Sequence, residues 1–222
     1  MGNRGPKPKG KVTIVWSPAF AYAIGLLVSD GSLSIDGRHI SFTSKDLEMI
    51  ENYQSALQIN VHIGKKSSGH QSVKKYFVVQ FGDVLFYEFL QKIGLTPNKS
   101  KTIGKVDILP EYFFDFLRGS FDGDGCTYSY FDPRWKSSFM FYTTFVSASR
   151  EHILWLQKEI YERLGISGHI TNDGKMKTKQ LKYAKADSLI LLRHMYPNEQ
   201  VLSLSRKRLK IEQMLRIIGE RL

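Results

Sequence analysis

The chain has 222 residues, of which 42% are hydrophobic and 24% charged, as is typical of a globular protein with a sizeable core. Lys and Arg together number 32 and Asp and Glu 21, which gives a formal net charge of +11 at pH 7. A basic excess of this size favours a polyanionic partner, nucleic acid before an anionic membrane surface. No apolar stretch reaches the roughly 20 residues that span a bilayer, so we expect no membrane-spanning segment.

The single cysteine, Cys126, excludes an intrachain disulfide and a cysteine-rich zinc site. It is typical of a reducing compartment. The apolar stretch at 18–28 follows several lysines, as in a signal peptide, but a similar stretch recurs deep in the chain, where no signal peptide can lie. We therefore expect an intracellular protein, in the cytoplasm or an organelle matrix, and not a secreted one.

The first half of the chain begins with a segment rich in Gly, Pro and Lys, and we expect residues 1–15 to form a basic, flexible arm. Asp36-Gly37 is typical of a hairpin turn, and Ser44 is a candidate cap for the helix that follows it. Hydrophobic spacing predicts a helix over 19–28, strands at 32–35 and 39–43, a helix over 47–57, strands at 61–65 and 76–81, and a helix over 84–93.

The second half repeats this order of elements. Local sequence supports the repeat, because INVHI at 59–63 resembles ISGHI at 166–170. The spacing predicts a helix over 112–121, strands at 127–131 and 139–146, a helix over 149–164, strands at 169–171 and 179–183, and helices over 188–195 and 205–218.

The repeat predicts an α+β fold made of two tandem, pseudo-symmetric αββαββ(α) units. The units span 16–100 and 111–222, and a linker at 101–110 joins them. Packed about a pseudo-twofold axis, they would form a saddle. Its antiparallel sheets would bury one face under helices and offer the other face to a ligand.

Each unit opens with a nine-residue segment, AIGLLVSDG at 23–31 and LRGSFDGDG at 117–125. Both segments have Gly at the third place and Asp-Gly at the last two. Glycine inside a helix costs about 1 kcal/mol relative to alanine, so it usually has a packing reason. We expect Gly25 and Gly119 to let two helix backbones touch.

The acids of these segments, Asp30 and Asp124, are predicted to lie at the C-terminal ends of helices. The helix dipole disfavours an anion there, so each acid requires a compensating cation. The glycines that follow, Gly31 and Gly125, are expected to adopt the left-handed conformation that ends many helices.

The two segments resemble degenerate copies of the nine-residue motif of the LAGLIDADG homing endonucleases. The resemblance covers roughly residues 17–210. It is specific because the motif occurs twice and each copy opens an αββαββ unit. The chain departs from the motif at Val28, Arg118 and Ser120. None of these positions holds the acid that binds metal in the family.

The resemblance implies a monomeric DNA endonuclease that cuts both strands of a long duplex target across the minor groove and leaves short 3′ overhangs. Asp30 and Asp124 would lie side by side and bind divalent metal, which relieves the repulsion between their carboxylates. Mg²⁺ is the expected ion, Mn²⁺ is expected to substitute, and Ca²⁺ is expected to support binding without cleavage. The backbone carbonyls of Ser29 and Gly123 resemble the family's further metal ligands, and Lys99 and Lys207 resemble its basic residues beside the cut phosphates.

The resemblance also implies that the saddle sheets face DNA, because a twisted two-stranded ribbon fits the major groove. Ser44 and Ser147 fall near the place of a polar pocket residue of the family. The residues expected to contact DNA are Arg38, Ser44, Lys65, Lys66, Lys74, Lys75, Tyr128, Tyr130, Arg134, Lys136, Ser147, Lys175, Lys177, Lys179, Gln180 and Lys182.

Other interpretations stay open beside this one. A protein of the same fold could bind nucleic acid without cutting it, as an intron maturase or a regulator. A hydrolase could use paired carboxylates on a small substrate, which the basic charge disfavours. His62 and His169 are predicted to occupy matched strand positions with a structural role rather than a metal-binding one, and Asp122 is predicted to be structural.

Overall fold

The structure is a computed structural model and describes residues 10–67, 75–172 and 178–222. The side chain of Lys136 and residues 1–9, 68–74 and 173–177 lie outside this description, as do the predicted DNA contacts Lys74, Lys175 and Lys177. In the described part of the chain, no helix has both the length and the apolar character needed to cross a bilayer.

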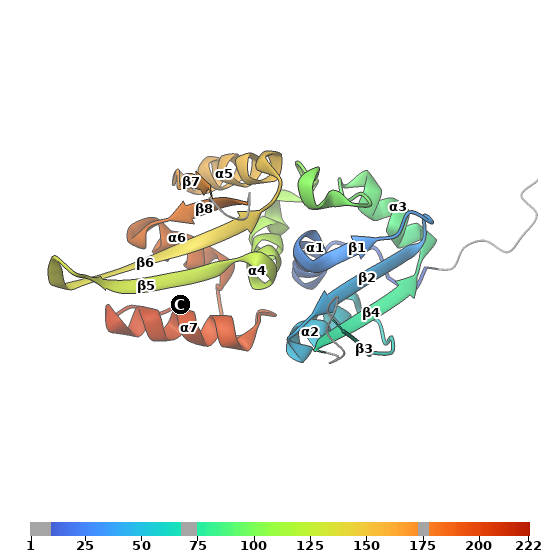
Figure 1. The fold of residues 1–222 in the computed structure, drawn as a ribbon, viewed down its shortest axis with the longest axis horizontal. Helices are drawn as coiled ribbons and strands as arrows, with labels where there is room; N and C mark the ends of the chain where they lie inside the picture. The colour runs from blue at the N-terminus through green and yellow to red at the C-terminus, as the bar shows by residue number, and fades with distance from the viewer. Residues whose placement is uncertain (1–9, 68–74, 173–177) are drawn as a thin grey trace, which may run out of the picture.

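The described residues of the N-terminal unit form three α-helices and one four-stranded sheet (Figure 1). Its strands are all antiparallel and lie in the order β1-β2-β4-β3. Its elements are α1 (Pro18–Asp30), β1 (Gly31–Leu33), β2 (His39–Ser44), α2 (Leu47–Leu57), β3 (Gly64–Lys66), β4 (Tyr76–Gly82) and α3 (Val84–Lys92).

The C-terminal unit has the same strand order, β5-β6-β8-β7, again antiparallel. Its elements are α4 (Phe113–Asp124), β5 (Cys126–Asp132), β6 (Trp135–Ser147), α5 (Arg150–Leu164), β7 (His169–Asn172), β8 (Lys179–Tyr183), α6 (Lys185–Met195) and α7 (Ser205–Ile217). Short 3-10 helices η1 (Lys99–Lys101) and η2 (Pro110–Tyr112) lie between the units. The matching order confirms the predicted α+β fold of two tandem units.

Helices α1 and α4 lie side by side at the centre, between the two sheets (Figure 1). Ser17 caps α1, because its hydroxyl accepts a hydrogen bond from the Phe20 amide at 3.1 Å. The following residues 20–27 are all buried. A helix that is apolar on every side is expected at the centre of a fold, with other elements packed around it.

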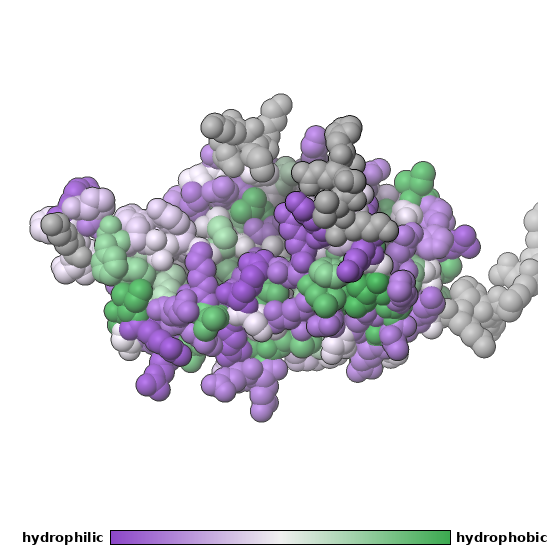
Figure 2. All heavy atoms as spheres, turned by 60° about the horizontal axis from the view of Figure 1, so that its bottom comes forward, coloured by the Kyte–Doolittle hydropathy of each residue, from purple (hydrophilic) through white to green (hydrophobic). Residues whose placement is uncertain are grey.

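One face of the molecule is shown in Figure 2. Hydrophilic side chains cover most of this face, and hydrophobic residues form separate patches between them. Scattered apolar residues of this kind are ordinary on a protein surface.

Several local predictions were wrong. Ser44 does not cap α2, since it ends β2 and its hydroxyl accepts from the Asp46 amide at 3.1 Å. Gly31 and Gly125 are extended, with φ of −84° and −75°, rather than left-handed. They are required for another reason: a Cβ on Gly31 would lie 2.6 Å from the Leu27 carbonyl oxygen, and one on Gly125 would lie 2.8 Å from that of Phe121.

The predicted flexible arm is also too long. The amides of Lys11 and Val12 donate to one carboxylate oxygen of Asp83, at 2.6 and 2.9 Å. The other oxygen of Asp83 accepts from the Phe86 amide and caps α3. Because Val12 is buried as well, the chain is docked on the N-terminal unit from this point.

Candidate active site

The two motif helices cross with their backbones in contact. A Cβ on Gly25 would lie 2.1 Å from the Phe116 carbonyl oxygen, and one on Gly119 would lie 2.1 Å from the Tyr22 carbonyl oxygen. No side chain fits into such a space, so the predicted packing reason for these two glycines is confirmed.

The C-terminal ends of both motifs meet at this interface. A Cβ on Gly123 would lie 1.8 Å from the Ser29 hydroxyl oxygen and 3.2 Å from a carboxylate oxygen of Asp30. Since Gly123 immediately precedes Asp124, the structure brings the two motif acids to the same end of the helix pair.

Two buried lysines supply the cations expected at these helix ends. The Lys99 ammonium donates to the Gly31 carbonyl at 2.5 Å. The Lys207 ammonium donates to the carbonyls of Phe121 at 2.6 Å, Gly123 at 3.1 Å and Gly125 at 2.6 Å. The Phe121 carbonyl also accepts from the Gly125 amide, at 2.9 Å. Both lysines therefore place a positive charge against carbonyls at the C-terminal helix ends, where the helix dipole favours a cation. Lys207 thereby contacts the Gly123 carbonyl that was expected to bind metal.

Burial and mutual repulsion disfavour the charged acids. Burial, and next the charge of Asp124, raise the pKa of Asp30 to about 6, while Lys207 and Lys99 act in the opposite direction. Burial also raises the pKa of Asp124, again opposed by both lysines. Burial lowers the pKa of Lys99 and of Lys207 to about 8, against the pull of neighbouring aspartates.

These acids fit a divalent cation. Carboxylate and carbonyl oxygens are the ligands that Mg²⁺ prefers, and a cation beside them would stabilise the charged forms that burial disfavours. Among the described residues, no three His, Cys, Asp or Glu side chains gather into a metal-binding group. An ion held by the two aspartates would therefore complete its shell with backbone carbonyls, water or a bound phosphate.

Without a metal ion, Asp30 is expected to lower the stability of the protein at neutral pH. Its pKa in the folded protein, about 6, lies above the ordinary 3.8. The folded state thus keeps a proton that the unfolded chain has lost, and the free energy of unfolding falls as pH rises from about 4 to about 6. In EDTA at pH 7, Asp30→Asn should raise that free energy by about 1–3 kcal/mol.

Urea denaturation of both proteins from about pH 4 to pH 7 checks this. The advantage of the variant should become small near pH 4, where the folded carboxyl is protonated and the unfolded carboxyl is only partly ionised. Equal stability of the two proteins at pH 7 would contradict the expected destabilisation by Asp30.

The open face of the C-terminal sheet carries several predicted DNA contacts. Tyr128 pairs with Tyr142 across β5 and β6, and the Tyr130 and Tyr142 rings are stacked with centroids 6.4 Å apart. Lys182 and Gln180 share this face on β8, because Leu181 and Tyr183 point into the core. These side chains line a shallow hollow.

Other predicted contacts lie elsewhere on the sheets. Lys65 pairs with Phe77 and lies over its ring, on the helix-covered face, whereas its neighbour Lys66 is on the open face. Lys179 shares the core side with Leu181 and donates to Asn172 at 2.7 Å. These positions follow from the two-residue period of a strand.

The two serines are used by the backbone. Ser147 at the end of β6 accepts from the Ser149 amide at 3.1 Å, as Ser44 does at the end of β2. Both hydroxyls thus shape the matching turns into α5 and α2. Ser44, Ser147, Lys65 and Lys179 therefore lie off the open faces of the two sheets.

The remaining basic contacts are exposed. Arg38 lies 3.7 Å from Asp36 in the β1–β2 turn, and Arg134 pairs with Asp132 at 3.1 Å in the β5–β6 turn. Lys75 is exposed just before β4. His62 lies before β3 while His169 opens β7, so the predicted match of the two histidines in strand positions was wrong.

A buried polar cluster around α4 was only partly predicted. Asp122 is fully buried and accepts hydrogen bonds from the Tyr22 hydroxyl at 2.8 Å and the Leu204 amide at 2.7 Å, which confirms its structural role. Arg118 is buried beside it and pairs with Asp115 at 2.6 Å. A charged residue inside an apolar helix is the sequence signal that could have identified Arg118 as part of a buried cluster.

The fold and the helix-interface site define a two-repeat LAGLIDADG architecture. Residues 17–94 match the family model of the LAGLIDADG-like domain. The structure is similar to full-length DUF199/WhiA from Thermatoga maritima, with a TM-score of 0.56 and 15% identity, covering 93% of this chain and 62% of that protein. The chain therefore spans less than two thirds of that relative's length.

Homing endonucleases are similar as well. The structure of I-WcaI bound to its DNA recognition sequence gives a TM-score of 0.62 at 14% identity, covering 94% of this chain and 95% of that chain. I-DmoI in complex with DNA and Mn gives 0.51 at 14% identity, covering 84% and 97%. The curated proteins contain no match. Residues 17–94 are thus similar to a LAGLIDADG-like domain, and the chain has the fold of the LAGLIDADG homing endonucleases, as the two motifs predicted.

Proposed function

We propose that this protein is a site-specific endonuclease that hydrolyses both strands of duplex DNA with Asp30, Asp124 and divalent metal. The observation that supports this best is the meeting of both motif ends at one helix interface, where two acids and two buried lysines converge. A structural role alone does not explain this convergence, because burial raises the pKa of both acids and lowers that of both lysines.

Asp30 and Asp124 would hold the metal, with Mg²⁺ as the expected ion and Mn²⁺ as a substitute. Bound there, a divalent ion supplies Lewis-acid stabilisation of the phosphate and activation of a water. The Ser29 carbonyl would be a further ligand, and the Gly123 carbonyl would become one if Lys207 turned toward the phosphate. Lys207 and Lys99 would then stabilise negative charge that develops on the phosphate oxygens.

The partner is double-stranded DNA, held on the open sheet faces. Those faces flank the α1–α4 pair on both sides, so a duplex lying across them would place its backbone over the motif acids (Figure 1). The formal charge of +11 favours such binding and predicts a strong salt dependence. One chain supplies both motifs, so we expect a monomer to be sufficient.

The proposal is tested by selecting duplexes from a randomised library in Ca²⁺ and then replacing Ca²⁺ with Mg²⁺. We expect one long sequence to be enriched, and we expect it to be cut when Mg²⁺ arrives. If the duplexes bound by the protein stay intact in both Mg²⁺ and Mn²⁺, the proposed endonuclease activity is refuted.

That second outcome would favour a DNA-binding protein without cleavage, such as a maturase or a regulator. One observation supports this alternative: the Lys207 ammonium already bonds to the Gly123 carbonyl. The same experiment, with structured RNA in place of duplex, separates a maturase from a DNA regulator.

A further inference from the structure

The two motifs differ in their buried polar residues. At the second place the first motif has Ile24 and the second has Arg118, and at the sixth place they have Val28 and Asp122. Only the second motif therefore carries buried charged side chains at these two places, and both bond to neighbouring backbone. Buried charges are costly unless they are fully hydrogen-bonded, so this difference calls for a specific account.

Asp122 holds the beginning of α7. One of its carboxylate oxygens accepts from the amide of Leu204, the residue that precedes the helix, at 2.7 Å. Lys207 lies three residues further on, in the first turn of α7. A shift of Leu204 would therefore move the Lys207 ammonium directly, without an intervening flexible segment.

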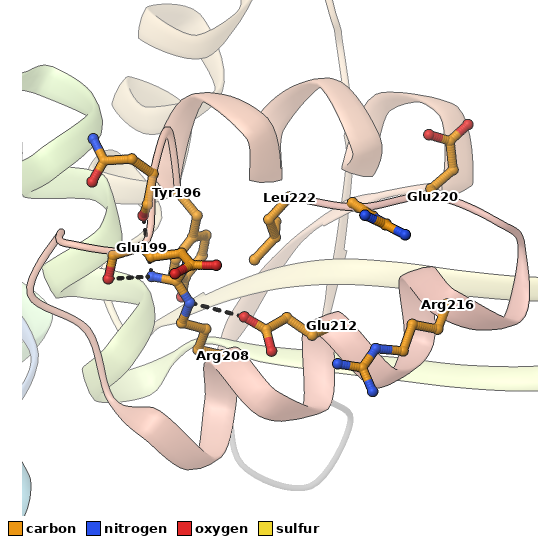
Figure 3. Close-up of a pocket in the computed structure, with 9 residues that line it drawn as sticks. Tyr196, Glu199, Arg208, Glu212, Arg216, Glu220 and Leu222 are labelled. Carbon is orange, nitrogen blue, oxygen red and sulfur yellow. Dashed lines mark hydrogen bonds and ion pairs between the residues drawn. The ribbon is translucent and has the colours of Figure 1, made fainter.

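Two arginines hold the connection between α6 and α7 from either side. Arg118 donates to the carbonyls of Met195 at 2.6 Å and Leu202 at 2.8 Å. Figure 3 shows Arg208 bonded to the Glu199 carbonyl, at 3.3 Å, and to the Glu212 carboxylate, at 3.0 Å. The irregular segment 196–204 is thus fixed at both ends and in its middle.

Lys99 is held in place differently from Lys207. Lys99 begins the three-residue helix η1, after Asn98 in the left-handed conformation with φ of 55°. Its ammonium bonds to one carbonyl, that of Gly31, whereas the Lys207 ammonium bonds to three. The side chain of Val28, at the place of Asp122, has no atom that could accept a hydrogen bond.

We propose that Asp122 is a positioning residue: it holds Lys207 in place for the cleavage of one DNA strand. Cleavage of the other strand depends on Lys99, which Asp122 does not position. This proposal rests on the proposed endonuclease function. It predicts that loss of Asp122 slows the cut served by Lys207 and leaves the cut served by Lys99 nearly unchanged. The variant would then behave as a nickase.

The test uses the full chain and a supercoiled plasmid that carries the selected target, with each strand end-labelled in a parallel assay. Asp122→Ala should slow one strand about 10²-fold, the scale expected when one essential stabilising group is misplaced, and the other strand less than about threefold. Nicked circles should accumulate. Lys207→Met should slow the same strand, and Lys99→Met the opposite one.

Two further variants separate positioning from general damage. Asp122→Asn keeps an acceptor for the Leu204 amide and should restore the strand to within about tenfold of wild type. Tyr22→Phe removes the other hydrogen bond of the same carboxylate oxygen and should leave the strand ratio unchanged. Duplex affinity in Ca²⁺ is measured for every variant.

Equal slowing of both strands by Asp122→Ala would overturn the proposal, as would a strand preference opposite to that of Lys207→Met. If Asp122→Ala fails to fold, Arg208→Gln loosens the same connection from its outer side and must show the same strand preference. A wild-type protein that binds its target but cuts neither strand would instead refute the proposed endonuclease function.

Discussion

Replacing either motif acid with its amide, Asp30→Asn or Asp124→Asn, is expected to abolish double-strand cleavage. Each carboxylate would supply a negative charge to the metal site that a neutral amide does not supply. The two acids also lie at one helix interface, where neither site is independent of the other. We expect the rate of linear product formation in Mg²⁺ to fall at least about 10²-fold. The measurement is single-turnover cleavage of the selected target.

Affinity for the duplex in Ca²⁺ should survive, because most of the DNA-binding energy comes from basic residues on the sheet faces rather than from the buried acids. Asp107→Asn is the matched control, since Asp107 is an exposed acid that pairs with Lys105 at 2.7 Å outside the site. It should change neither cleavage nor affinity. Full cleavage by either motif variant would rule out a shared metal site.

Adding a single methyl group at the helix crossing is expected to cause the largest loss of stability. In Gly25→Ala the new Cβ would lie 2.1 Å from a backbone oxygen of α4, and Gly119→Ala places one equally close to α1. Backbone cannot move aside as a flexible side chain can, so the helices must separate and the core around them must repack. We expect each change to cost about 3 kcal/mol or more.

For a chain of this length, such a loss corresponds to a Tm lower by about 10 °C, which thermal denaturation measures directly. Gly104→Ala is the control, because its Cβ would meet only the Glu151 carboxylate at 3.5 Å. It should stay within about 0.5 kcal/mol of wild type. A Gly25→Ala protein as stable as this control would contradict the close helix crossing.

The repeat and the order of elements could be predicted from sequence, because they depend on patterns that both halves share. The meeting of the motif acids was expected from the resemblance that these patterns carry. Hydrophobic spacing located each α-helix of the described residues but neither short 3-10 helix, and paired glycines implied a close backbone approach. Both are local or repeated features of the sequence. The matched positions of Gly25 and Gly119, for example, can be identified without knowing which side chains surround them.

What could not be predicted depends on contacts between distant segments. The connection between α6 and α7 is held by Arg118, whose side chain bonds to the carbonyls of Met195 and Leu202. The faces of Lys65 and Lys179 depend on the strand register, which a shift of one residue reverses. The conformation of Gly31 follows from a tight passage of the chain against Leu27, and no local turn pattern reveals it.

The position of the two cuts on a selected target tests the central claim most directly. Two acids side by side under one minor groove can reach only phosphates that face each other across that groove, and these are offset toward the 3′ end of each strand. Sequencing both cut ends after Mg²⁺ cleavage should therefore show short 3′ overhangs centred within one long site. Blunt ends, 5′ overhangs or cuts at scattered sites would contradict a shared active site formed by Asp30 and Asp124.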